Sequence, residues 1–172
     1  MTPELAALVQ DVPDYPQQGI VFKDLTPLLA DGDGLRAVVE ELAGHHAPGT
    51  VDKVAGIEAR GFLLAGPVAL ALGVGVVPIR KSGKLPREVH ETSYELEYGS
   101  NAIAVHRDAF APGERVLVVD DVLATGGTAA AAVHLVERSG AVAVGVSVVL
   151  ELGFLDGRRA LPGVDVRALL TA

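Results

Sequence analysis

Short, almost wholly apolar runs alternate along this chain with longer helix-like runs, and this alternation restricts the fold more than any other feature. Four runs have the composition of buried strands: KVAGI (53–57), VGVVPIR (74–80), VLVV (116–119) and AVAVGVSVVLEL (141–152). Strands that are apolar on both faces are typical of a parallel sheet covered by helices on both sides. We therefore predict an α/β fold, a doubly wound and mostly parallel sheet flanked by helices.

The segments between these strands complete the pattern. Pro67 lies inside one apolar helical run and predicts a kink or a late start for that helix. Residues 81–100 are polar and charged, so we expect an irregular loop there that is functional. Short extended segments are expected at 19–24 and 101–106. Helices are expected at about 2–9, 35–46, 59–73 and 126–139, the second of them capped by Asp33.

Composition narrows the class of protein further. The 172 residues show no linker or internal repeat, so residues 1–172 are expected to form a single domain. The absence of cysteine excludes disulfides and thiolate metal sites. A net charge of −8 argues against a nucleic-acid partner. No signal peptide or run of ~18 apolar residues is evident, which predicts a cytoplasmic protein with no membrane contact.

Two aspartates and a glycine-rich turn directly follow the VLVV strand. Asp120 and Asp121 stand at its carboxyl end, where open parallel sheets bind ligands. The turn ATGGT (124–128) leads into a helix, and the free N–H groups at a helix start favour phosphate. Carboxylates can accept hydrogen bonds from hydroxyl groups close by. The two features together predict a ligand such as ribose 5-phosphate.

Other interpretations of this motif are weaker. Asp-Asp after an apolar run also occurs in the magnesium-binding strand of nucleotide triphosphatases. That class requires G-x-x-x-x-G-K-[ST], which is absent here, as is the dinucleotide fingerprint G-x-G-x-x-G. A strand, turn and helix that bind nothing would be a fair interpretation of TGGT alone. The two adjacent acids at the strand end disfavour it.

The stretch VLVVDDVLATGGT (116–128) resembles the phosphoribosyl pyrophosphate signature of the type I phosphoribosyltransferase family. This resemblance implies a phosphoribosyltransferase fold with a mobile lid loop, here at about 81–100. It also implies that Asp120 and Asp121 hold the ribose 2′- and 3′-hydroxyls. The same resemblance assigns the 5′-phosphate to the loop residues Ala124, Thr125, Gly126, Gly127 and Thr128.

Three further stretches resemble the adenine-specific members of this family: 19–29, 56–86 and 94–100. Relatives that use 6-oxopurines usually carry an aspartate where this chain has Ala124. The resemblance therefore implies transfer of the phosphoribosyl group of phosphoribosyl pyrophosphate to adenine, which gives AMP and pyrophosphate in purine salvage. A transferase for xanthine or hypoxanthine, or a non-catalytic sensor of phosphoribosyl pyrophosphate, remains the alternative.

The resemblance also assigns the remaining site residues. Glu97, in the lid, would assist proton transfer at the purine. Without the resemblance, Glu97 would be interpreted as an ordinary solvated loop glutamate. Phe22 would stack on adenine and Arg60 would lie near it, with Val21 and Lys23 offering backbone groups. Magnesium would be held mainly by substrate oxygens and water, with no dedicated protein ligand, and the family usually forms homodimers. The pyrophosphate group would be bound by Glu58, Ala59, Arg80, Lys81 and Lys84.

Overall fold

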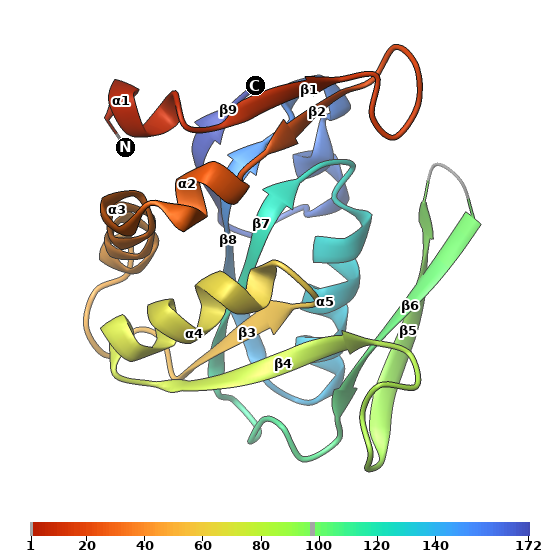
Figure 1. The fold of residues 1–172 in the computed structure, drawn as a ribbon. Helices are drawn as coiled ribbons and strands as arrows, with labels where there is room; N and C mark the ends of the chain where they lie inside the picture. The colour runs from red at the N-terminus through yellow and green to blue at the C-terminus, as the bar shows by residue number, and fades with distance from the viewer. Residues whose placement is uncertain (1, 97–98) are drawn as a thin grey trace.

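The computed structural model describes residues 2–96 and 99–172 and builds them around a seven-stranded sheet of order β5-β6-β4-β3-β7-β8-β9 (Figure 1). The five strands from β4 to β9 in this order are mutually parallel. Strand β6 is antiparallel to both of its neighbours, β4 and β5. The doubly wound, mostly parallel α/β fold is thereby confirmed. The strands are β3 (Lys53–Ile57), β4 (Gly75–Lys81), β5 (Val89–Leu96), β6 (Gly99–His106), β7 (Arg115–Leu123), β8 (Val142–Glu151) and β9 (Val166–Thr171).

Helices cover both faces of the sheet. On one face lies α5 (Gly127–Arg138), and on the other lie α2 (Thr26–Ala30), α3 (Gly32–Gly44) and α4 (Gly61–Leu72). Strand β7 shows why the run 116–119 is apolar on both faces of the sheet. Val116 and Val118 pack in the α5 layer, while Leu117 and Val119 pack in the layer of α3 and α4. Alternate side chains thus enter two separate cores, as the strand periodicity requires.

Smaller elements lie beyond the carboxyl ends of the central strands. Helix α1 (Pro3–Ala6) leads into an antiparallel hairpin of β1 (Gln10–Pro13) and β2 (Val21–Asp24). In Figure 1 this hairpin lies past the tip of β7. The short helices η1 (Gly153–Leu155) and η2 (Gly157–Ala160) connect β8 to β9. Both groups of elements therefore border the edge of the sheet where a ligand is expected.

The expectation of irregular structure throughout 81–100 is wrong for its second half. Strand β5 pairs with β6 from Val89↔His106 onward. Its polar sequence is compatible with a strand because it lies at the edge of the sheet, with one face exposed and the other against α5. Arg138 Nη1 of α5 donates to Glu91 O over 2.9 Å and ties the two together.

Two helix starts also differ from expectation. Asp31, not Asp33, caps α3, because Asp31 Oδ1 accepts a hydrogen bond of 2.7 Å from Gly34 N. Helix α4 starts later than expected, at Gly61, and contains Pro67 within it. In the part of the chain that the structure describes, no helix is long and apolar enough to cross a membrane.

Candidate active site

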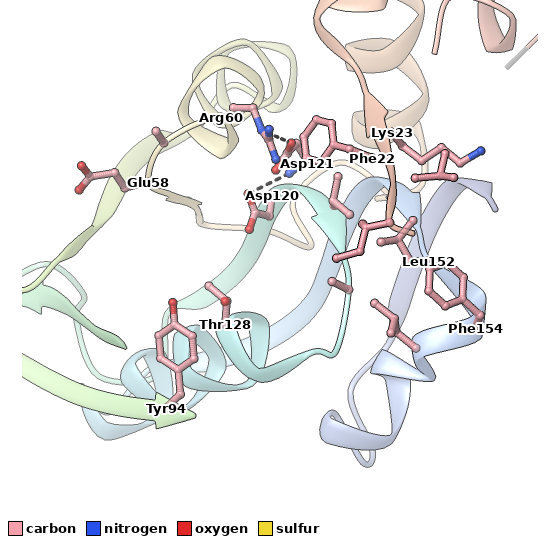
Figure 2. Close-up of a pocket in the computed structure, with 16 residues that line it drawn as sticks. Phe22, Lys23, Glu58, Arg60, Tyr94, Asp120, Asp121, Thr128, Leu152 and Phe154 are labelled. Carbon is pink, nitrogen blue, oxygen red and sulfur yellow. Dashed lines mark hydrogen bonds and ion pairs between the residues drawn. The ribbon is translucent and has the colours of Figure 1, made fainter. Parts of the chain in front are cut away.

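A cavity of about 700 Å³ opens beyond the carboxyl ends of β3 and β7 (Figure 2). Its walls come from β2, the β3–α4 connection, β5, the β7–α5 turn and the segment after β8. Asp120 and Asp121 lie in its middle, with Glu58 toward one end and Phe22 and Leu152 toward the other. The cavity contains ten of the residues expected from sequence: Val21, Phe22, Lys23, Glu58, Ala59, Arg60, Asp120, Asp121, Ala124 and Thr128.

The paired aspartates end the apolar part of β7. Asp121 is 5% exposed, and its Oδ2 lies 2.5 Å from Arg60 Nε. Asp121 Oδ2 is fully buried, and Arg60 is the charged group that faces it among the described residues. Asp120 Oδ1 accepts a hydrogen bond of 2.9 Å from Asp121 N. Both carboxylates are therefore fixed before any ligand binds.

The ionised form of the Asp120 carboxyl group is destabilised in this position. It keeps some exposed surface, but burial of its carboxyl group raises its pKa well above the usual range. The negative charge of Asp121 raises the pKa of Asp120 further, while the Asp121 N–H and Arg60 act in the opposite direction. Two adjacent carboxylates with one guanidinium leave excess negative charge. Hydroxyl donors or a cation would relieve it.

Gly61, the first residue of α4, touches the aspartate pair through its backbone. A Cβ at this position would lie 2.8 Å from Asp120 Oδ1 and 2.9 Å from Val119 O. Only glycine allows α4 to begin this close to the end of β7. The start of the helix and the aspartates are thereby held together.

Arg60 connects two parts of the cavity. Its Cζ lies 5.6 Å from the ring centroid of Phe22, a cation–π distance, while its Nε contacts Asp121. Tyr15 packs edge-on against the Phe22 ring with a centroid separation of 5.3 Å. Lys23 Nζ binds Asp11 Oδ1 at 2.6 Å on the neighbouring strand β1. The Lys23 side chain is therefore occupied outside the cavity.

The β7–α5 turn has the geometry of an anion site. Ala124 and Thr128 line the cavity, and Thr125, Gly126 and Gly127 complete the turn between them. Gly126 has a φ of 84° and precedes α5 with no side chain capping the helix. The first N–H groups of α5 therefore lack a capping side chain, and together with the helix dipole they favour an anion.

The other expected anion-binding residues are arranged around Glu58, where the Glu58–Ala59 peptide bond is cis. Glu58 Oε2 accepts hydrogen bonds from Arg80 Nε (3.1 Å) and Lys81 N (3.0 Å). Burial opposes ionisation of Glu58, but these donors hold its pKa below the usual value. Arg80, Lys81 and Lys84 are absent from the described part of the cavity wall. Arg80 and Lys81 adjoin it through Glu58, and Lys84 O accepts a hydrogen bond of 3.1 Å from Arg80 Nη1.

Several lining residues were not expected. Leu152, Phe154 and Leu155 form an apolar wall after β8, and Tyr94 of β5 points into the cavity near Thr128 (Figure 2). The wall follows the carboxyl end of an apolar strand directly, and this position in the sequence could have indicated that it borders the ligand site. Glu97, expected to be catalytic, lies outside the described residues.

Known proteins are similar to this chain over most of its length. Residues 24–160 match the family model described as phosphoribosyl transferase domain. A protein called adenine phosphoribosyltransferase from Acidothermus cellulolyticus is 61% identical over 166 residues, which cover 96% of this chain and 94% of that protein.

Solved structures are similar to it as well. The crystal structure of adenine phosphoribosyltransferase from Thermoanaerobacter pseudethanolicus has a TM-score of 0.94 and 45% identity, covering 98% of each chain. The enzyme of that name from Saccharomyces cerevisiae, solved with an imino-altritol bisphosphate and adenine, has a TM-score of 0.86 and 39% identity, covering 95% of this chain and 94% of its own.

Proposed function

Because the chain belongs to the phosphoribosyltransferase family, and within it to the adenine phosphoribosyltransferases, we infer that the cavity described above is its active site. The enzyme transfers the phosphoribosyl group of phosphoribosyl pyrophosphate to adenine and forms AMP and pyrophosphate, a reaction of purine salvage. One observation carries the assignment of the site. Two carboxylates and a helix start meet at the end of β7, between Glu58 and Phe22.

In this proposal the ribose phosphate occupies the middle of the cavity. Asp120 and Asp121 accept hydrogen bonds from the 2′- and 3′-hydroxyls, which the excess negative charge of the pair favours. The loop 124–128 binds the 5′-phosphate through backbone N–H groups at the start of α5 and through the hydroxyls of Thr125 and Thr128. Charge repulsion is avoided because the carboxylates face the sugar and the helix start faces the phosphate.

Adenine lies between Phe22 and the wall that contains Leu152. Phe22 stacks on the base, and backbone groups of Val21 and Lys23 bind its edge. The Lys23 side chain pairs with Asp11, which supports a role for its backbone rather than its ammonium group. Arg60, placed between Phe22 and Asp121, lies near both the purine and the ribose.

The reaction breaks the bond between C1′ and the pyrophosphate oxygen, and adenine N9 forms the new bond to C1′. Positive charge develops on the ribose in between, so water must be kept out. The β5–β6 hairpin is the proposed lid. Glu97 is the residue proposed to take the proton that adenine loses or to hold the protonated purine. Ala124 offers no carboxylate for this step, which supports the assignment of adenine over 6-oxopurines.

Pyrophosphate leaves toward the Glu58 end of the cavity. Backbone groups of Glu58 and Ala59 bind it. Arg80 supplies positive charge once a substrate competes with Glu58 for its guanidinium, and the ammonium groups of Lys81 and Lys84 add to this charge. Removal of this charge should slow pyrophosphate departure. A triple replacement of these basic residues that left the KM for pyrophosphate unchanged would contradict the assignment.

Magnesium fits this site as an ion that arrives with the substrate. The described residues contain no group of three or more His, Cys, Asp or Glu side chains that could hold a metal. The donors near the ribose are carboxylate oxygens of Asp120 and Asp121, which suit a hard cation. Bound to pyrophosphate oxygens and water, magnesium would neutralise charge on the leaving group. Turnover that persists after chelation of all divalent ions would refute this requirement.

The base assignment predicts a simple selectivity. With phosphoribosyl pyrophosphate and magnesium present, adenine is expected to release pyrophosphate, whereas hypoxanthine, guanine and xanthine release it far more slowly. The measurement is a coupled assay of pyrophosphate with each base in turn. Release with hypoxanthine but not with adenine would overturn the assignment, and binding without any release would favour the sensor alternative.

Replacement of Asp120 by Asn is expected to stabilise the free enzyme and weaken the binding of phosphoribosyl pyrophosphate. The raised pKa of Asp120 means that its ionised form destabilises the fold at neutral pH. The gain in melting temperature should shrink as the pH falls toward the unfolded pKa of about 4 and disappear below it, where Asp120 is protonated in both states. Affinity should fall roughly tenfold or more, because a charged hydrogen-bond acceptor is lost.

Melting curves across this pH range and equilibrium binding test both parts. Asp121→Asn should also weaken binding, so normal affinity in both variants would remove the aspartates from ribose recognition.

We also propose that the enzyme is a cytoplasmic homodimer, as is usual in this family. Helix α4 leaves Leu63 and Leu70 exposed, the latter to 82%, and Val76 on the neighbouring strand β4 is also exposed. Leu63 and Leu70 are seven residues apart and so lie on one face of α4, and exposed apolar side chains on one face favour burial against a second copy. A monomer mass by light scattering at micromolar concentration would contradict the homodimer. Recovery of the protein with membranes on cell fractionation would contradict the cytoplasmic location.

A further inference from the structure

An ion pair between buried Glu151 and exposed Arg158 fastens the segment that follows β8. Glu151 is the last residue of β8, and Arg158 lies in η2. Arg158 Nε donates to Glu151 Oε1 at 2.8 Å, and Arg158 Nη2 donates to Glu151 Oε2 at 2.8 Å. The remaining arm, Arg158 Nη1, donates to Val166 O of β9 at 2.7 Å. One guanidinium therefore links the end of β8 to the start of β9 and closes the segment between them into a loop.

The closed segment forms two parts of the active site. Leu152, Phe154 and Leu155 are the apolar wall of the cavity. Gly157, next to Arg158, supports the phosphate loop from outside the cavity. A Cβ on Gly157 would lie 2.2 Å from Ala124 O and 3.1 Å from Gly126 N.

The contact is reciprocal, since a Cβ on Gly126 would lie 2.1 Å from Gly157 O. Backbone meets backbone here with no side chain between. Any displacement of η2 therefore passes directly to the turn that binds the 5′-phosphate.

We propose that Glu151 and Arg158 are positioning residues that fix the phosphate loop and the purine wall relative to each other. This inference rests on the proposed function of the cavity. The pair does not touch substrate. It sets the distance between the two ends of the nucleotide site, and so it acts on the binding of phosphoribosyl pyrophosphate and of adenine together. The pyrophosphate end, built on Glu58 and Ala59 after β3, does not depend on it.

The chain contains a matched pair with which to separate positioning from general stabilisation. Asp52 and Arg115 form the same forked ion pair, with Arg115 Nε to Asp52 Oδ2 at 2.9 Å and Arg115 Nη2 to Asp52 Oδ1 at 2.7 Å. Arg115 begins β7, so this pair lies at the end of the sheet opposite Asp120. It shares the geometry of the Glu151–Arg158 pair but contacts no residue of the cavity.

The experiment compares Glu151→Gln and Arg158→Lys with Asp52→Asn and Arg115→Lys in the full-length enzyme. We expect the first two to raise the KM for phosphoribosyl pyrophosphate and for adenine about tenfold, since small misplacements in a site have large effects. The KM for pyrophosphate in the reverse reaction, at saturating AMP, should stay at the wild-type value. The control variants should lower the melting temperature without changing any KM.

Unchanged KM values for both substrates in Glu151→Gln and Arg158→Lys would overturn the proposal, even if turnover or stability fell. A rise in the KM for all three substrates would overturn it too, because it would indicate general loosening. Should Glu151→Gln not fold, Gly157→Ala gives a direct test, since its Cβ must displace the phosphate loop. That variant must raise the KM for phosphoribosyl pyrophosphate. Failure of the wild-type enzyme to use adenine would instead refute the proposed function.

Discussion

Replacement of Glu97 by Gln is expected to lower turnover with adenine about 10²–10⁴-fold, the usual contribution of a positioned acid or base. The affinity for phosphoribosyl pyrophosphate should change little, because the proposed ribose and phosphate contacts come from β7 and the turn after it. Glutamine keeps the size of the side chain and removes only its ability to take a proton. Steady-state kcat and equilibrium binding of phosphoribosyl pyrophosphate, measured on the same preparation, separate the two effects.

Glu95 supplies the matched control, because it is the same residue type two positions earlier in the sequence. Glu95→Gln is expected to retain wild-type turnover, since this residue has no assigned role. If Glu97→Gln turned over adenine at the wild-type rate, Glu97 would have no part in the mechanism. Equal losses in both variants would point to the charge of the hairpin rather than to one proton-transfer group.

Replacement of Gly61 by Ala is expected to lower kcat/KM for phosphoribosyl pyrophosphate about 10²-fold, a magnitude typical of small misplacements in an active site. The new Cβ would lie 2.8 Å from Asp120 Oδ1 and 2.9 Å from Val119 O, so α4 or the end of β7 must move. Such a movement displaces Asp120 together with the 58–60 segment. Overpacking of this kind also costs about 1–3 kcal/mol of stability.

Gly66→Ala is the control on the same helix, because a Cβ at Gly66 meets nothing within 4 Å outside its chain neighbours. It should leave kcat/KM unchanged. Kinetics and thermal melts of both variants are the measurement. Wild-type kcat/KM in Gly61→Ala would show that the close approach of α4 to the aspartates is not needed for catalysis.

The central part of the fold follows from the sequence because its signals are local. KVAGI predicts β3 to the residue, Lys53–Ile57, since a short apolar run between polar neighbours is too short for a buried helix and favours a buried strand. The aspartate pair could be placed at the ligand edge for the same reason. Asp120 ends a continuous apolar run, and parallel sheets bind ligands at that edge.

The rest depends on contacts between distant parts of the chain. Strand β5 was expected to be irregular because VHETSY is polar, and only its packing on α5 and pairing with β6 favour a strand. The wall at Leu152–Leu155 gave no chemical signal, since apolar residues after a strand are more often core. Asp31 and Asp33 are both suitable caps, and the structure alone selects Asp31.

The contact between Gly126 and Gly157 also has a consequence for biosynthesis. The phosphate loop is translated well before the purine wall and the Gly157 segment that supports it, and β9 follows both. A nascent chain can form β3, β4 and β7, but it cannot complete the nucleotide site until β9 has left the ribosome. Affinity for phosphoribosyl pyrophosphate is therefore gained late, and ligand binding reports a late stage of folding rather than its beginning.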